Sequence, residues 1–123
     1  MPVDQRWRAR ILIVEDAPIL ALDLEETLVD AGFNIAAIAG NLEKALALIE
    51  NGACDVAILD ANLAGVSSSP LASEMTARGL PFVVLSGYAS EQLQEAFPGA
   101  LFLQKPCRAA QLIQALNTIL PKR

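Results

Sequence analysis

The sequence has 123 residues, of which 54% are hydrophobic and 19% charged, so it is large and apolar enough for one folded domain and is not intrinsically disordered. Polar residues interrupt every apolar run before the roughly 18 residues of a membrane span, and acids within the N-terminal apolar run exclude a signal peptide. The net charge of −5 argues against a nucleic-acid-binding face. We therefore expect a cytoplasmic protein that binds neither membranes nor nucleic acid.

Short apolar runs alternate with amphipathic runs along the chain. The apolar runs have the length of β-strands, and the amphipathic runs repeat apolar residues at helical spacing. We expect strands at residues 11–14, 34–39, 56–59, 82–85 and 100–103, and helices at 18–31, 42–50, 70–79, within 87–97 and at 108–120. Pro18 and Pro70 favour helix starts, Asn41 can cap the second helix, and the Gly/Ser-rich residues 64–69 favour a loop.

The strand pattern predicts the fold class. Because the predicted strands are apolar throughout, both faces of their sheet should be buried. Five strands alternating with five helices then predict an α/β fold, with a doubly wound five-stranded parallel sheet in the flavodoxin-like order 2-1-3-4-5. We expect residues 1–123 to form one domain, with its core at about 10–120 and without an output domain.

Polar side chains follow four of the five predicted strands. Glu15 and Asp16 follow the first strand, Asp60 the third, Ser86 the fourth and Lys105 the fifth. Right-handed crossovers bring these strand ends to one edge of the sheet, where such folds bind ligands. Three carboxylates that converge there repel one another unless a cation such as Mg²⁺ lies between them. With a hydroxyl and an ammonium group beside it, this site suits phosphoryl transfer to a carboxylate.

Four segments give this pattern a family resemblance: ILIVED at 11–16, VAILDANLAG at 56–65, VVLSGY at 83–88 and LQKP at 103–106. Their order and spacing resemble the receiver domain of two-component response regulators over essentially the whole chain. The resemblance implies that Asp60 accepts the phosphoryl group and that Glu15 and Asp16 hold Mg²⁺, with Mn²⁺ as an alternative. It also implies that Asp60 and the backbone carbonyl of Asn62 bind the metal.

The resemblance assigns further residues around the phosphoryl group. Ser86 matches the hydroxyl that senses this group, and Lys105 matches the lysine that pairs with it. Pro106 matches the proline whose preceding peptide bond is cis in the family. Phe102 falls at the position of the family's rotating aromatic residue, although a Phe in a strand is equally well explained as part of the core.

Two features differ from the usual receiver. The segment between Ser86 and Lys105 is a few residues shorter, which predicts a short or irregular fourth helix. Ser86-Gly87-Tyr88 resembles the Thr/Ser-Gly-x-Tyr-like sequence of a subclass of single-domain receivers in α-proteobacteria. We expect these residues to form a mobile loop that closes on the phosphoryl group and alters the surface formed by the fourth helix, the fifth strand with Phe102, and the last helix. Tyr88 could instead contact a partner or cover a helix end.

The resemblance also implies partners. The phosphoryl group would come from a histidine kinase or a histidine phosphotransfer protein, and the signal would leave by contact with a downstream protein or by onward phosphotransfer. We expect a monomer, with oligomerisation on activation as an alternative. The domain would support its own phosphorylation and dephosphorylation without being an enzyme with a separate catalytic domain.

Three other functions are less consistent with the sequence. A phosphatase of the haloacid-dehalogenase type needs Asp-x-Asp after its first strand and acids after the lysine, and residues 106–123 contain no acid. A flavodoxin-like cofactor binder needs a hydroxyl- and Gly-rich loop where Glu15 and Asp16 stand. A degenerate receiver that only binds partners would have lost one of the site residues.

The remaining charged and sulfur-containing residues receive simpler interpretations. Arg6, Arg8 and Arg10 are interpreted as a solubilising N-terminal tail. Cys54 and Cys107 are the only cysteines, and without any histidine they form no zinc site. We expect both thiols to be reduced and to have no functional role.

Overall fold

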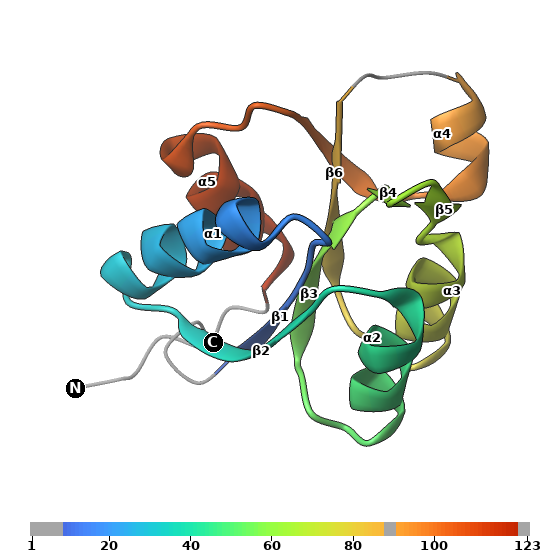
Figure 1. The fold of residues 1–123 in the computed structure, drawn as a ribbon, viewed down its shortest axis with the longest axis horizontal. Coiled ribbons are helices and arrows are strands. Elements are labelled where there is room, and N and C mark those ends of the chain that lie inside the picture. The colour runs from blue at the N-terminus through green and yellow to red at the C-terminus, as the bar shows by residue number, and fades with distance from the viewer. Residues whose placement is uncertain (1–8, 88–90, 121–123) are drawn as a thin grey trace.

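The main sheet of the protein has the predicted topology. A computed structural model describes residues 9–87 and 91–120 (Figure 1). The sheet contains β1 (Arg10–Val14), β2 (Asn34–Ala39), β3 (Val56–Asp60), β6 (Phe82–Ser86) and β7 (Leu101–Gln104). These strands lie in the order β2-β1-β3-β6-β7, and every neighbouring pair is parallel. The predicted doubly wound α/β fold is therefore confirmed.

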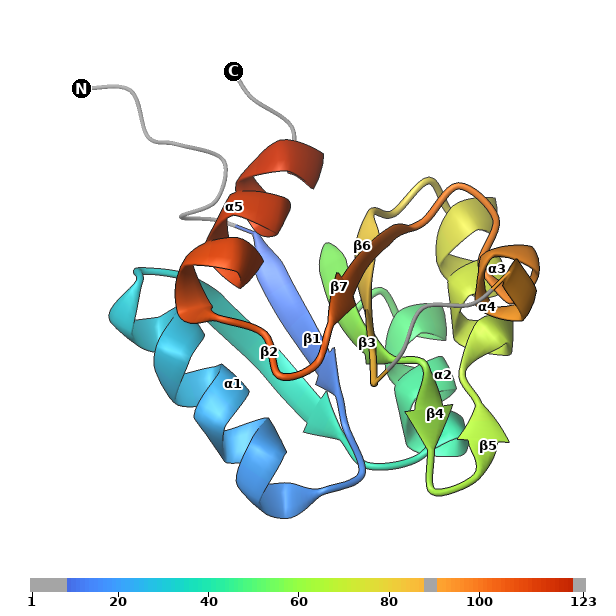
Figure 2. The same ribbon diagram turned by 90° about the horizontal axis from the view of Figure 1, so that it is seen from above.

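Helices cover both faces of this sheet. They are α1 (Pro18–Asp30), α2 (Leu42–Glu50), α3 (Ser69–Ala77), α4 (Glu91–Ala96) and α5 (Ala109–Ile119). Figure 2 shows α1 and α5 on one side of the sheet and α2, α3 and α4 on the other. The fourth helix has only six residues, as the short segment before Lys105 predicted. None of the described helices is both long and apolar enough to cross a membrane.

Alternate residues of the central strands supply the two cores. Ile11 and Ile13 of β1 pack into the cluster beneath α1 and α5, whereas Leu12 and Val14 pack into the cluster beneath α2 and α3. Side chains alternate between the faces of a strand, so a strand buried on both faces must be apolar at every position. This packing fixes the register and brings the carboxyl ends of β1, β3, β6 and β7 to one edge.

Arg10 does not belong to a solubilising tail, so that interpretation was wrong for this residue. Arg10 begins β1, and its guanidinium pairs with Asp55, which precedes β3, through N–O distances of 3.1 Å to both carboxylate oxygens. A third bond of 3.0 Å runs from the guanidinium to the carbonyl of Gly52. Hydrogen bonds from Arg10 lower the pKa of the Asp55 carboxyl group. The pair joins β1 to β3 at the edge opposite the carboxylates. Arg6 and Arg8 lie outside the described residues.

A small hairpin follows β3 where the sequence predicted a loop. The antiparallel strands β4 (Asn62–Leu63) and β5 (Val66–Ser67) are joined by Ala64 and Gly65. Both turn residues have positive φ angles, 51° at Ala64 and 90° at Gly65. This pattern is typical of a type I′ turn, which favours Asn-Gly over Ala-Gly.

The turn predicts a stabilising substitution. Ala64→Asn should raise the free energy of unfolding by about 1 kcal/mol, because asparagine adopts positive φ more readily than alanine. The same change at Ala47, an exposed position inside α2, should lower stability by about 0.5 kcal/mol through helix propensity. Urea unfolding of both variants measures the two effects. Changes in the free energy of unfolding that have the same sign at the two positions would contradict the assigned turn geometry.

Candidate functional site

Three carboxylates meet at the carboxyl edge of the sheet. Glu15 and Asp16 directly follow β1, and Asp60 ends the neighbouring strand β3. One oxygen from each carboxylate lies within 4.8 Å of the others. Glu15 and Asp60 are buried, whereas Asp16 is more open to solvent. The site therefore concentrates negative charge where water cannot fully screen it, as the strand-end pattern predicted.

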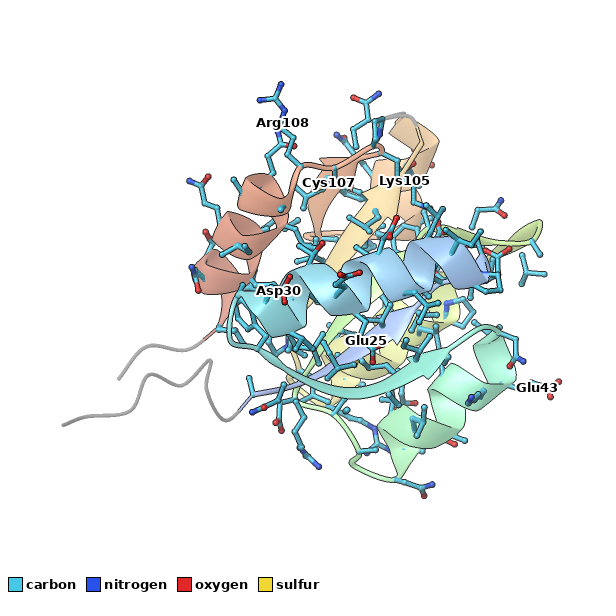
Figure 3. The ribbon with its side chains drawn as sticks, turned by 60° about the vertical axis from the view of Figure 1, so that its left-hand side comes forward. Glu25, Asp30, Glu43, Lys105, Cys107 and Arg108 are labelled. Carbon is cyan, nitrogen blue, oxygen red and sulfur yellow. The ribbon has the colours of Figure 1, made fainter. Side chains whose placement is uncertain are left out.

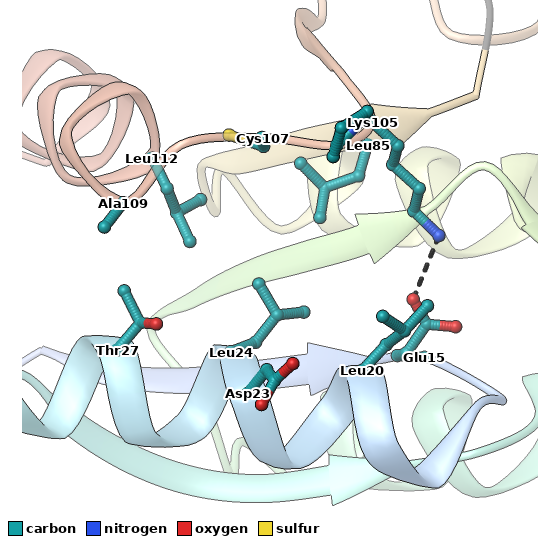
Figure 4. Close-up of a pocket in the computed structure, with 11 residues that line it drawn as sticks. Glu15, Leu20, Asp23, Leu24, Thr27, Leu85, Lys105, Cys107, Ala109 and Leu112 are labelled. Carbon is teal, nitrogen blue, oxygen red and sulfur yellow. Dashed lines mark hydrogen bonds and ion pairs between the residues drawn. The ribbon is translucent and has the colours of Figure 1, made fainter.

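Lys105 inserts its ammonium group between two of these carboxylates. Its Nζ lies 3.0 Å from Glu15 Oε1 and 2.8 Å from Asp60 Oδ2. Figure 3 shows Lys105 in the segment between β7 and α5, and Figure 4 shows its ammonium pointing at the Glu15 carboxylate. The backbone N–H of Lys105 donates to the carbonyl of Ser86 over 2.7 Å, and the Lys105–Pro106 peptide bond is cis. The ion pairs hold the lysine side chain against Asp60 and Glu15, and the backbone bond joins Lys105 to the end of β6.

Burial and pairing act in opposite directions on these groups. Burial raises the pKa of Glu15 and outweighs the hydrogen bonds from Lys105 and from the backbone of Ala17, which favour the ionised form. Burial also disfavours the charged form of Lys105, but its hydrogen bonds to Asp60 and Glu15 prevail and raise its pKa. The ammonium is therefore stabilised by the carboxylates, while Glu15 is harder to ionise than an exposed glutamate.

The raised pKa of Glu15 predicts a pH effect on the metal-free protein. Since folding raises this pKa, the contribution of Glu15 to stability is present below its usual value of 4.5 and is lost as pH rises through the folded-state value. Glu15→Gln does not titrate there, so its stability relative to wild type should increase as the pH rises above 4.5. Urea unfolding with a chelator, with Glu26→Gln on the exposed surface of α1 as control, measures this. If the stability of Glu15→Gln relative to wild type stays constant or falls as the pH rises, the raised pKa of Glu15 is contradicted.

The segment after Asp60 is tied back to it by hydrogen bonds. The backbone N–H of Asn62 donates to Asp60 Oδ1 over 3.2 Å, and the side-chain oxygen of Asn62 accepts from Gly65 over 2.6 Å. The Ser68 hydroxyl donates to the backbone carbonyl of Asp60 over 2.6 Å. The sequence placed Ser68 in a loop without a role. Only its position within a Gly/Ser-rich stretch could have suggested the contact.

The other residues that the sequence predicted for the site differ in their burial and in their contacts. Ser86 is buried at the end of β6, one position beyond the pairing of Asp60 with Leu85. Phe102 is partly buried in β7 against the core beneath α2 and α3, and its ring meets Phe97 edge-on at a centroid distance of 6.1 Å. Gly87 is exposed at the end of the described segment. Tyr88 lies outside the described residues.

The match of this chain to known proteins is extensive. Residues 11–117 match the family described as response regulator receiver domain. The chain belongs to this family. Receivers are signalling domains rather than catalytic enzyme domains, and they work with histidine kinases in two-component systems.

Individual relatives support the assignment. Transcriptional regulatory protein PdtaR of Mycobacterium tuberculosis is 32% identical over 112 residues, and the match covers 88% of this chain but only 55% of PdtaR. The solution structure of SdrG from Sphingomonas melonis Fr1 is 34% identical, with a TM-score of 0.75 and coverage of 89% of this chain and 93% of SdrG. A response regulator receiver protein from Sinorhizobium medicae WSM419 is 31% identical, with a TM-score of 0.78 and coverage of 89% and 92%.

The acidic cluster of this receiver fits a divalent cation. Oxygen ligands that converge from separate strand ends are the donors that Mg²⁺ and similar hard ions prefer. Glu15, Asp16 and Asp60 each contribute a carboxylate, and among the described residues one ammonium, that of Lys105, pairs with them. The excess of negative charge therefore favours a bound cation.

A cavity of about 460 Å³ opens beside the receiver site, between α1 and α5 (Figure 4). Leu24 of α1 faces Leu112 of α5 across it, and Leu20 of α1 also lines it. Glu15 and Lys105 also line it. The ion pair between these two residues therefore borders both the carboxylate cluster and the cavity.

Proposed function

We propose that this receiver accepts a phosphoryl group on the carboxylate of Asp60 from the phosphohistidine of a histidine kinase or a histidine phosphotransfer protein. In this step an Asp60 oxygen forms a bond to phosphorus, the phosphorus–nitrogen bond breaks, and the imidazole leaves. The observation that carries the proposal is the position of the Lys105 ammonium, 2.8 Å from Asp60 Oδ2, beside three convergent carboxylates.

Glu15, Asp16, Asp60 and the backbone carbonyl of Asn62 would hold Mg²⁺, with Mn²⁺ as an alternative. The metal would neutralise charge on the transferring phosphoryl oxygens. Lys105 is already bound to Asp60 and can pair with a phosphoryl oxygen as negative charge arrives there. The buried position of Ser86 at the end of β6 allows its hydroxyl to approach the same group, and such a hydrogen bond to an anion is stronger than one between neutral groups.

We further propose that the signal leaves through the surface formed by α4, β7 and α5. A hydrogen bond that Ser86 makes to the phosphoryl group in one conformation only can shift an equilibrium between two conformations. Phe102 of β7 and Gly87, which follows Ser86, adjoin this surface, and Tyr88 would also belong to it. A BeF₃-activated conformation has been solved for SdrG, at 37% identity to this chain, which supports activation by phosphorylation here.

The resemblance of Ser86-Gly87-Tyr88 to the α-proteobacterial subclass is part of the same proposal, and the likeness to SdrG supports it. The downstream step would be contact with a protein partner or onward phosphotransfer, in the cytoplasm where kinases of this type phosphorylate receivers. We also propose that the protein is a monomer until activation.

Intact-mass spectrometry tests the proposed reaction. Wild-type protein incubated with phosphoramidate should gain one phosphoryl group when Mg²⁺ is present and should gain essentially none with a chelator. Borohydride reduction followed by peptide mapping should place the modification on residue 60. Modification at another residue, or at equal rates with and without Mg²⁺, would overturn the proposal.

A further inference from the structure

Ser68 is a fully buried polar residue whose contacts serve the acceptor segment. It has no exposed surface and stands at the N-cap position of α3. Serine at this position usually accepts a hydrogen bond from the first turn of its helix. Here the side chain makes no such bond, and the hydroxyl instead donates to the carbonyl of Asp60 over 2.6 Å. The bond made to the acceptor segment thus replaces the usual capping bond.

The carbonyl of Asp60 needs this partner because of its place in the sheet. The ladder between β1 and β3 ends with the pair Val14 and Leu59, one residue before Asp60. The N–H of Ala61 donates to Leu85 of β6, so the Asp60 carbonyl in the same peptide group points away from β6, past the end of β1. The Ser68 hydroxyl supplies the hydrogen bond that this buried carbonyl would otherwise lack.

A second hydrogen bond from Ser68, made by its backbone, fixes the orientation of the next peptide group. The backbone N–H of Ser68 donates to the carbonyl of Ala61 over 3.0 Å. Ser68 therefore holds two successive peptide groups, one on each side of Ala61. The next N–H along the chain, that of Asn62, donates to Asp60 Oδ1 over 3.2 Å. The orientation of these peptide groups determines where the Asp60 carboxylate and the Asn62 backbone lie relative to Lys105.

We propose that Ser68 is a positioning residue for phosphoryl transfer to Asp60, an inference that rests on the proposed function. Its hydroxyl fixes the peptide group after Asp60 and so holds the carboxylate and the Asn62 carbonyl in the arrangement that binds the metal and meets the phosphoryl donor. Residues that orient metal ligands typically change metal affinity or activity by about 10- to 100-fold when they are replaced.

Phosphorylation by phosphoramidate across a Mg²⁺ titration tests this role. Ser68→Ala should raise the Mg²⁺ concentration for half-maximal rate, or lower the rate at saturating Mg²⁺, by about tenfold or more. Ser68→Thr keeps the hydroxyl and should recover most of the loss. Ser67→Ala is the matched control, because Ser67 is exposed and its hydroxyl accepts from the N–H of Ser69 without reaching the acceptor segment. This control should behave like wild type.

The outcomes separate positioning from simple stability. If Ser68→Ala unfolds more easily but shows wild-type rate and Mg²⁺ dependence at a temperature where it is folded, the positioning role is overturned while phosphorylation of Asp60 stands. If Ser68→Ala does not fold, Ser68→Cys, which has similar volume and a weaker donor, takes its place with the same expected loss. Absence of Mg²⁺-dependent phosphorylation of wild type at Asp60 would overturn both proposals.

Discussion

Asparagine in place of Asp60 is expected to abolish phosphorylation by phosphoramidate or by a phosphohistidine donor, with a loss of at least about 10³-fold in rate. The amide retains the shape of the carboxylate, and its oxygen can accept from Lys105 Nζ or from the N–H of Asn62, which now bind Asp60 over 2.8 and 3.2 Å. It lacks the anionic oxygen that would bond to phosphorus. The fold should therefore survive while the reaction is lost.

Asp55→Asn is the matched control for this experiment. Asp55 lies just before β3, at the edge of the sheet opposite Asp60, where it pairs with Arg10 through exposed side chains. This substitution should lower stability by about 1 kcal/mol or less and leave phosphorylation unchanged. Intact-mass measurements on the two variants and wild type decide the assignment. An Asp60→Asn protein that is phosphorylated at the wild-type rate would show that another residue is the acceptor.

The sheet could be predicted from the sequence because its central strands β1, β3 and β6 are buried on both faces. In β1, Ile11 and Ile13 serve one core and Leu12 and Val14 the other, so the run is apolar without alternation. The same burial ends these central strands at or directly before a polar residue, namely Glu15, Asp60 and Ser86. Candidate site residues such as Glu15 and Asp60 could therefore be read directly at strand ends, and parallel topology alone brought those ends together.

Features that depend on distant contacts could not be predicted in this way. Arg10 looked like part of a basic tail because its partner Asp55 is far away in the sequence. Ser68 looked like a loop residue, since its bond to the Asp60 carbonyl exists only after the β4–β5 hairpin has folded back. Local composition predicted a loop for the Gly/Ser-rich segment, but it predicted neither the β4–β5 hairpin nor the hydrogen bonds across it.

The first helix shows another limit of periodicity. The apolar residues of α1 repeat at helical spacing, yet Leu28 is fully buried while Ile19 and Leu22 are 75% and 58% exposed. Spacing identifies a helix, but it does not show which apolar residues face the sheet when they extend around much of the helix circumference. The exposed side chains were therefore indistinguishable from core residues in the sequence.

Millimolar Mg²⁺ is expected to raise the thermal stability of this receiver. The metal-free site holds Glu15, Asp16 and Asp60 with their oxygens within 4.8 Å of one another and with Lys105 paired to two of them. A cation that binds only the folded protein stabilises it by about 2.7 kcal/mol at a concentration ~100 times its dissociation constant. For a domain of this size that corresponds to a rise in melting temperature of about 10 °C.

Specific binding is distinguished from general screening by three comparisons in the same melting experiment. NaCl at matched ionic strength screens the repulsion among the carboxylates but supplies no divalent cation for them to coordinate. It should therefore produce only a small part of the rise in melting temperature. Asp16→Asn removes one of the three carboxylates and should lose most of the Mg²⁺ effect. Asp23→Asn removes an acid of α1 that lines the adjoining cavity but lies outside the cluster, so it should keep the effect. An equal Mg²⁺ shift in the Asp16 and Asp23 variants, or no shift in wild type, would contradict a metal site formed by these carboxylates.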